Sequence, residues 1–158
     1  MYKILVFSDT HHKTDLCEKL LARSSDVNMV LHAGDCVKDA LEMSYVFSDI
    51  DFKIVRGNND YMSDEKDEIL FDVCDKKIFL THGHEYAVKY GYSYIARRAK
   101  NLGADIAVFG HTHEAYMGKK DGVYLLNPGS AGFCAHPGYG VITIENNILN
   151  ASLHEFWF

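Results

Sequence analysis

Five apolar segments of the chain end in side chains of the kind that bind metal ions. Each segment finishes in Asp, Asn or His, and imidazole and carboxylate groups suit Zn, Mn, Fe or Ni. The set contains no cysteine, which argues against a thiolate-rich structural site. Its members are Asp9, His11, Asp35, Asn58, His82, His111 and His113.

The spacing of these residues predicts two metal ions rather than one. In Asp-x-His at 9–11 and His-x-His at 111–113, alternate side chains of an extended segment lie on one side and can reach a common pocket. Seven ligands are too many for one tetrahedral ion and suit two ions that share a carboxylate. Two divalent cations carry more charge than Asp9 and Asp35 neutralise, so the centre would attract phosphate and activate water.

The segments that must position these residues predict an α/β fold. The early chain alternates strand and helix, which indicates a parallel sheet with right-handed crossovers. The later chain is rich in strands, and so many strands with three or four helices predict two mixed sheets packed face to face with helices outside. The carboxyl ends of the strands would then line one crevice. We expect strands at 3–7, 27–33, 52–57 and 104–111, strand pairs within 68–83, 115–130 and 138–156, and helices at 14–25, 37–47 and 90–103.

Length and composition fit a single domain over residues 1–158. The chain has 47% hydrophobic residues and a net charge of −6, which argues against sequence-independent binding of nucleic acid. It starts directly in a predicted strand and has no apolar run of ~18 residues, so we expect a cytoplasmic protein without membrane contact. The four cysteines form no paired motif and are expected to be small buried hydrophobes.

The ordered motifs resemble those of the calcineurin-like metallophosphoesterases, and specifically the small YfcE-like phosphodiesterases. The motifs are SDTH, HAGD, GNND, THGH and GHTH, followed by NPGS at 127–130, and together they cover essentially the whole chain. The resemblance implies a four-layer αββα sandwich and a dinuclear, metal-dependent phosphodiesterase that uses a metal-bridging hydroxide. The NPGS segment is either a simple turn or part of the phosphate pocket.

The resemblance also implies a role for each ligand. Asp9, His11 and His113 would hold the first metal ion, Asn58, His82 and His111 the second, and Asp35 would bridge the two. Mn²⁺ is the first expectation for both ions, with Ni²⁺, Fe, Zn²⁺ and Mg²⁺ as alternatives.

The catalytic candidates are Asn59, Asp60 and His84. Many members of this family have His where this chain has Asn59. In those proteins the His stabilises the transition state or protonates the leaving oxygen. An Asn can donate a hydrogen bond to a phosphoryl oxygen but cannot supply a proton near neutral pH. Asp60 is expected to brace the loop. His84 has two open interpretations, a catalytic substitute for the missing His or a support for the metal ligands.

An alternative function follows from the fold alone. The retromer scaffold subunit shares it and acts as a non-catalytic protein-interaction module that has lost some metal ligands. All seven ligand positions are filled here, which favours the enzyme. Cyclic nucleotides, nucleic-acid ends and small phosphodiesters all remain as substrates of the phosphate-ester class, and a homodimer is one option for the assembly.

Overall fold

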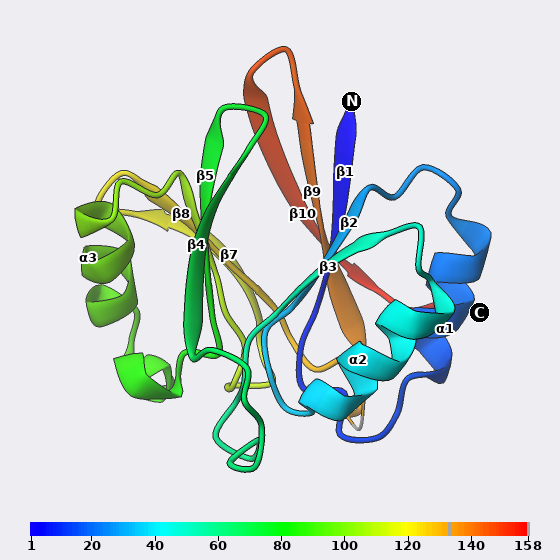
Figure 1. The fold of residues 1–158 in the computed structure, drawn as a ribbon. Coiled ribbons are helices and arrows are strands. Elements are labelled where there is room, and N and C mark those ends of the chain that lie inside the picture. The colour runs from blue at the N-terminus through cyan, green and yellow to red at the C-terminus, as the bar shows by residue number, and fades with distance from the viewer. Residues whose placement is uncertain (133, 158) are drawn as a thin grey trace.

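Two five-stranded mixed sheets form the centre of the protein (Figure 1), in a computed structural model that describes residues 1–132 and 134–157. The first sheet has the order β10-β9-β1-β2-β3, with β1 parallel to β2 and antiparallel to β9. Its strands are β1 (Tyr2–Phe7), β2 (Met29–His32), β3 (Asp51–Ile54), β9 (Gly138–Glu145) and β10 (Ile148–Glu155).

The second sheet has the order β4-β5-β6-β8-β7, in which β6 is parallel to both of its neighbours. Its strands are β4 (Glu68–Val73), β5 (Lys76–Thr81), β6 (Ile106–Val108), β7 (Ala115–Lys120) and β8 (Val123–Pro128). In Figure 1 the two sheets stand side by side, and the helices lie on their outer sides. The predicted sandwich of two mixed sheets with helices outside is therefore confirmed.

Three α-helices cover the outer faces. Helices α1 (Asp15–Arg23) and α2 (Val37–Val46) lie on the first sheet, and α3 (Ser93–Asn101) lies on the second, after two short 3-10 turns at His84–Tyr86 and Val88–Tyr90. None of the helices in the described part of the chain is long and apolar enough to cross a bilayer.

Strand β1 shows why the central strands are apolar throughout. Ile4 and Val6 face the core between the two sheets, whereas Leu5 and Phe7 face the core under α1 and α2. Successive side chains of a strand point to opposite faces, so a strand covered on both sides has no polar face. The continuous apolar run ILVF at 4–7 is what a strand covered on both faces requires.

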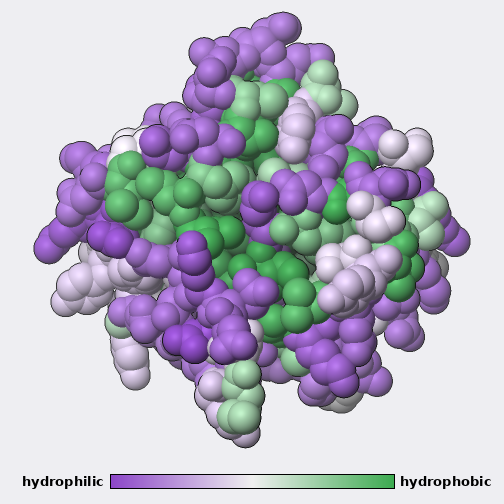
Figure 2. Space-filling model, viewed as in Figure 1, coloured by the Kyte–Doolittle hydropathy of each residue, from purple (hydrophilic) through white to green (hydrophobic). Residues whose placement is uncertain are grey.

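The core between the sheets reaches the surface at one edge of the sandwich. Figure 2 shows hydrophobic residues gathered across the middle of the face that carries β3 and β4 in Figure 1. Ile69, Phe71 and Val73 of the edge strand β4 are partly buried against that core.

Several predicted segments are longer than the observed elements, as 104–111 is against β6 at Ile106–Val108. In the strand pair expected within 115–130, β7 continues to Lys120 and the turn is made by Asp121 and Gly122, with φ of 52° and 86°. Positive φ at both positions is the geometry that two-residue hairpins favour. Strand β3 ends at Ile54, because after Val55 the amide of Arg56 turns to the carbonyl of Lys66.

His32, the last residue of β2, is a buried core histidine. Its Nδ1 accepts a hydrogen bond from the amide of Gly34 at 3.3 Å, and its Nε2 lies 3.2 Å from Oγ1 of Thr10. The Thr10 hydroxyl donates to Asp39 at 2.6 Å, so the Nε2–H of His32 is the donor to Thr10. The ring is fully buried, and this burial lowers its pKa from 6.5 to about 4.

This depressed pKa predicts a loss of stability in acid. The folded protein keeps His32 neutral, so its contribution is complete above pH 6.5 and is lost as pH falls towards 4, where the unfolded chain takes up a proton first. The difference corresponds to about 3 kcal/mol. We expect the unfolding free energy of metal-free His32→Gln protein, measured in urea, to fall less over this pH range. His136→Gln at an exposed position should follow the wild type; an equal decline in all three proteins would refute this account.

Candidate metal centre

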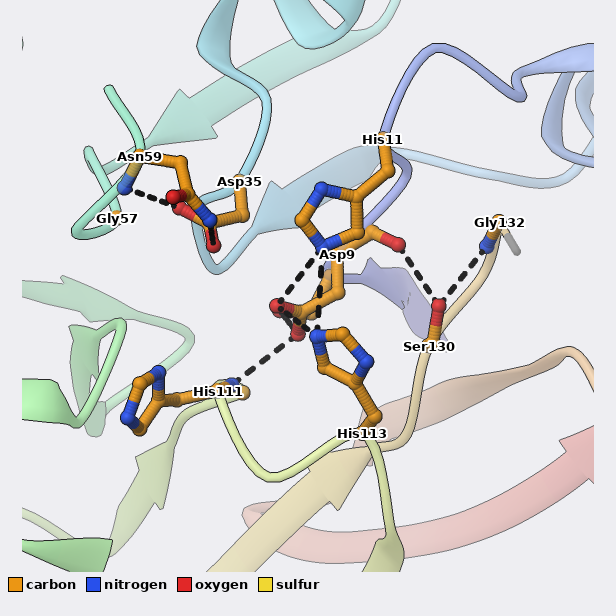
Figure 3. A network of polar contacts seen from close by, with 12 residues as sticks. Asp9, His11, Asp35, Gly57, Asn59, His111, His113, Ser130 and Gly132 are labelled. Atoms are coloured by element: carbon orange, nitrogen blue, oxygen red, sulfur yellow. Dashed lines mark hydrogen bonds and ion pairs between the residues drawn. The ribbon is translucent and has the colours of Figure 1, made fainter. Parts of the chain in front are cut away.

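The five predicted strand ends meet at one place between the two sheets. Within each sheet the loops are joined, as the amide of Asp9 donates to the carbonyl of Gly34 and the amide of Gly110 to that of His82. Between the sheets, the amide of His111 donates to Oδ2 of Asp9 at 3.1 Å and Nδ1 of His82 to the carbonyl of Ala33 at 2.6 Å. Figure 3 shows Asp9, His11, Asp35, His111 and His113 grouped around this point. The prediction that these ends converge is confirmed.

Asp9 lies at the centre of the group and is fully buried. Its Oδ2 accepts hydrogen bonds from the hydroxyl of Ser8 at 2.6 Å and from the amide of His111 at 3.1 Å. Its Oδ1 has no hydrogen-bond partner in the described structure, although Nε2 of His113 lies 3.1 Å away. Burial would raise the pKa of Asp9, but the neighbouring His113 and His82 outweigh it, so the pKa is lowered and the group is an anion.

Two further imidazoles face the same oxygen. Nε2 of His11 and Nε2 of His82 lie 3.9 and 4.0 Å from Oδ1 of Asp9, and the Nε2 atoms of His11 and His113 are 3.3 Å apart. Asp9, His11 and His113 thus present three donor atoms within 4.8 Å of one another. These three residues are the set that the sequence predicted for the first metal ion.

A second group forms around His82. The Nδ1–H of this ring donates to the carbonyl of Ala33 at 2.6 Å, so in the neutral ring Nε2 carries a lone pair. That nitrogen lies 3.1 Å from Oδ1 of Asn58 and 3.6 Å from Oδ2 of Asp35. Three atoms with lone pairs therefore face one another, and a cation bound between them would accept all three lone pairs.

His111 completes the second group from the loop after β6, in the same sheet as the strand that precedes His82. Its ring centroid lies 5.0 Å from that of His82. Burial, together with His82 and Lys89, lowers its pKa to about 4, so the ring is neutral near neutral pH, as a ligand must be. The unpartnered oxygen of Asp9 and these neutral imidazoles fit divalent metal ions bound by nitrogen and oxygen.

Asn59 and Asp60 both act on the loop of Asp35. The backbone N–H of Asn59 donates to Oδ1 of Asp35 at 3.0 Å and its side-chain amide to Oδ2 at 2.6 Å, so Asn59 holds the carboxylate predicted to bridge the metals. Asp60 accepts the amides of Asp35, Val37 and Gly57 at 2.8–2.9 Å. Both oxygens of Asp60 are occupied, which places it as a brace rather than a group that contacts substrate.

His84 lies beside the second group. Its ring centroid is 5.4 Å from that of His82 and 6.0 Å from that of His111. The pKa of His84 is lowered, mainly by burial and to a smaller extent by His82. Its Nδ1 is buried without a hydrogen-bond partner in the described structure. Neither of the two predicted roles is excluded by this position.

Several supporting residues were not identified as such from the sequence. Ser130 donates its hydroxyl to the carbonyl of Asp9 at 2.8 Å (Figure 3). Asn127 donates its amide to the carbonyl of Gly110 and to Oγ1 of Thr112, both at 2.9 Å. The NPGS segment therefore fixes the two loops that carry Asp9 and the His-x-His pair. Its position after a strand and its polar side chains were the available signals.

Comparison with known proteins identifies a family to which the sequence is similar. The sequence model of the calcineurin-like phosphoesterase superfamily domain matches residues 2–147. The probable metallophosphoesterase YsnB of Bacillus subtilis is 30% identical over 156 residues, which cover 96% of this chain and 90% of that protein. Phosphodiesterase MJ0936 of Methanocaldococcus jannaschii is 29% identical over 165 residues, which cover 90% and 93%.

Solved structures share the fold. A predicted phosphoesterase from Streptococcus pneumoniae superposes with a TM-score of 0.81 at 23% identity and covers 99% of this chain and 92% of its own. A Vps29 mutant from Entamoeba histolytica superposes with a TM-score of 0.76 at 22% identity, with coverage of 98% and 99%. At these identities the two structures support the fold alone.

Proposed function

Because the chain belongs to the calcineurin-like phosphoesterase superfamily, we propose that it is a dinuclear metal-dependent phosphodiesterase. Asp9, His11 and His113 would hold the first ion, Asn58, His82 and His111 would hold the second, and Asp35 would bridge them. Mn²⁺ remains the first expectation for both ions.

The observation that carries this proposal is the unpartnered Oδ1 of Asp9. A buried carboxylate oxygen without a hydrogen bond costs free energy, and buried charges are normally paired or coordinate metals. Nε2 atoms of His113, His11 and His82 surround this oxygen at 3.1, 3.9 and 4.0 Å. Hydrogen bonding to Asp9 raises the pKa of His113, and divalent cations between the oxygen and the nitrogens would replace that proton and neutralise the carboxylate.

Bound ions would supply a Lewis acid for the phosphoryl oxygens and lower the pKa of the attacking water. The residues of the chain supply the positions. Asn59 fixes the plane of the Asp35 carboxylate through two hydrogen bonds, and Asp60 fixes the loop beneath it. His84, whose Nδ1 has no partner in the described structure and whose ring centroid lies 5.4 Å from that of His82, would be the histidine available to protonate the leaving oxygen.

The scaffold alternative makes a different prediction. A protein that only binds partners has no need for a buried anion faced by three imidazoles, and its binding would not depend on the ions. The complete ligand set favours the enzyme.

Hydrolysis measured with added metal tests the proposal. Purified protein with Mn²⁺ should hydrolyse an activated aryl phosphodiester, lose this activity in excess chelator and regain it when Mn²⁺ is returned. A parallel panel of phosphomonoesters and cyclic nucleotides identifies the substrate class. Hydrolysis that is absent with each of the candidate metals, or equal with and without chelator, would leave the scaffold as the better account.

The Asn at position 59 predicts a dependence on the leaving group. Asn59→His should raise kcat/KM for diesters with alkyl leaving groups by about 10²-fold, the usual gain from a positioned acid, and change the activated aryl diester little. Asn59→Ala is the control, because it removes the hydrogen bond to Asp35 without adding an acid. An unchanged rate on alkyl leaving groups would show that His84 or water already supplies the proton.

A further inference from the structure

A second kind of ligand cluster lies next to the proposed metal centre and uses none of its seven residues. Nδ1 of His12 is 3.4 Å from Oδ1 of Asp39 and 3.9 Å from Sγ of Cys36, and one donor atom from each residue lies within 4.8 Å of the others. The three residues come from the loop after β1 and the start of α2. The sequence predicted that all four cysteines are buried, which was wrong for three of them, because Cys36 and Cys134 are only partly buried and Cys74 is exposed.

The carboxylate of this cluster is held in place from behind. Asp39 is 4% exposed, and its Oδ2 accepts the hydroxyl of Thr10 at 2.6 Å and the amide of His12 at 2.8 Å. His32 in turn donates to Thr10. Oδ1, which takes no part in these bonds, faces His12. Metal-binding carboxylates are commonly held by such hydrogen-bonded partners.

The donor atoms and their distances suit zinc. Thiolate, imidazole and carboxylate are all zinc ligands, and a tetrahedral zinc site separates its donor atoms by roughly 3.3–3.7 Å. The nitrogen-to-oxygen distance already falls in this range, and the nitrogen-to-sulfur distance needs only a small movement of His12, whose side chain is 78% exposed. Mn²⁺ and Mg²⁺ prefer oxygen ligands, so the thiolate gives this cluster a different metal preference from that of the sulfur-free centre beside it.

We propose that His12, Cys36 and Asp39 form a third metal site, which binds Zn²⁺ with one coordination position open to solvent. His11 and Asp35 would then belong to the dinuclear centre, while the residues that follow them in the chain, His12 and Cys36, would belong to the zinc site. Zinc would join the loop that carries Asp9 to the start of α2, and would brace the two segments that hold both carboxylates of the proposed dinuclear centre.

Cobalt spectroscopy tests this site separately from catalysis. Metal-free full-length protein, kept reduced with a non-thiol reductant, is titrated with Co²⁺ while the near-ultraviolet thiolate-to-cobalt charge-transfer band is recorded. The wild type should develop the band, and Zn²⁺ should abolish it. Cys36→Ser should lack the band and bind one metal ion fewer per chain, and Ser is a favoured residue at the N-cap that Cys36 occupies, so this variant should fold.

Two more variants complete the test. His12→Gln should weaken Co²⁺ affinity at the thiolate site by about tenfold or more, since even outer-sphere partners contribute that much. Cys74→Ser, at an exposed cysteine in the β4–β5 turn, should leave the band unchanged. No band in the wild type, a band that persists in Cys36→Ser, or a band lost in Cys74→Ser would each overturn the site. Since none of the seven proposed ligands is a cysteine, the band reports on this site whether or not the protein hydrolyses phosphodiesters.

Discussion

Asp9→Asn should abolish metal-dependent hydrolysis without destabilising the metal-free protein. The Asn oxygen can keep both hydrogen bonds that Oδ2 accepts from Ser8 and His111, while the new NH₂ takes the place of the unpartnered Oδ1. The variant thus loses one charge and one metal ligand and no protein hydrogen bond. Loss of a metal ion worth several kcal/mol predicts a kcat about 10³-fold lower.

The stability measurement separates this prediction from simple misfolding. At mildly alkaline pH, metal-free Asp9→Asn should unfold in urea at a denaturant concentration no lower than the wild type, because the variant lacks a buried charged oxygen that has no hydrogen-bond partner in the described structure. Added Mn²⁺ should raise the melting temperature of the wild type more than that of the variant. Full activity in the variant, or an unfolded variant, would contradict the role given to Asp9.

Gly57→Ala should inactivate the enzyme by moving Asp35. A Cβ at position 57 would lie 2.0 Å from Oδ1 and 2.7 Å from Cγ of Asp35, and nonbonded atoms do not approach so closely. The carboxylate must therefore shift away from the hydrogen bonds that Asn59 donates and from His82. A displacement of about 1 Å in a catalytic group costs on the order of 10²-fold, which should be seen in kcat/KM with saturating Mn²⁺.

A glycine with positive φ that lies away from the site provides the control. Gly103 follows α3 with a φ of +72°, and a Cβ there would meet no atom within 4 Å. Gly103→Ala should lose about 1–2 kcal/mol of stability through backbone strain and keep its activity. Activity lost equally in both variants would show that stability, rather than the position of Asp35, explains the effect.

Much of the fold and the grouping of the site followed from local sequence signals. The apolar run at 3–7 predicted a strand, and the strand pair expected within 138–156 is confirmed as a hairpin that turns at Asn146 and Asn147, with φ of 50° and 63°. The polar ends of five strands converged because parallel strands place their carboxyl ends at one edge. Periodicity and turn chemistry are local properties, so one sequence suffices to detect them.

The rest depended on contacts between distant residues. Nothing in the sequence indicated that the side-chain amide of Asn59 donates to Asp35, which is 24 residues away in the chain. Cys36 was expected in the core, but it is only partly buried and lies beside His12, 24 residues away. The bracing bond from Ser130 to Asp9 spans 121 residues. Such pairings follow from how the loops pack, and loop packing leaves no periodic signal in the sequence.

Electron paramagnetic resonance of the Mn²⁺-loaded protein tests the central claim most directly. Two Mn²⁺ ions that share the Asp35 carboxylate lie about 3.5–4 Å apart, close enough for their electron spins to couple. With two equivalents of Mn²⁺ bound, the wild type should give an exchange-coupled spectrum, and Asp9→Asn should give the hyperfine pattern of isolated ions. A wild-type spectrum of isolated Mn²⁺ at full phosphodiesterase activity would contradict the dinuclear centre.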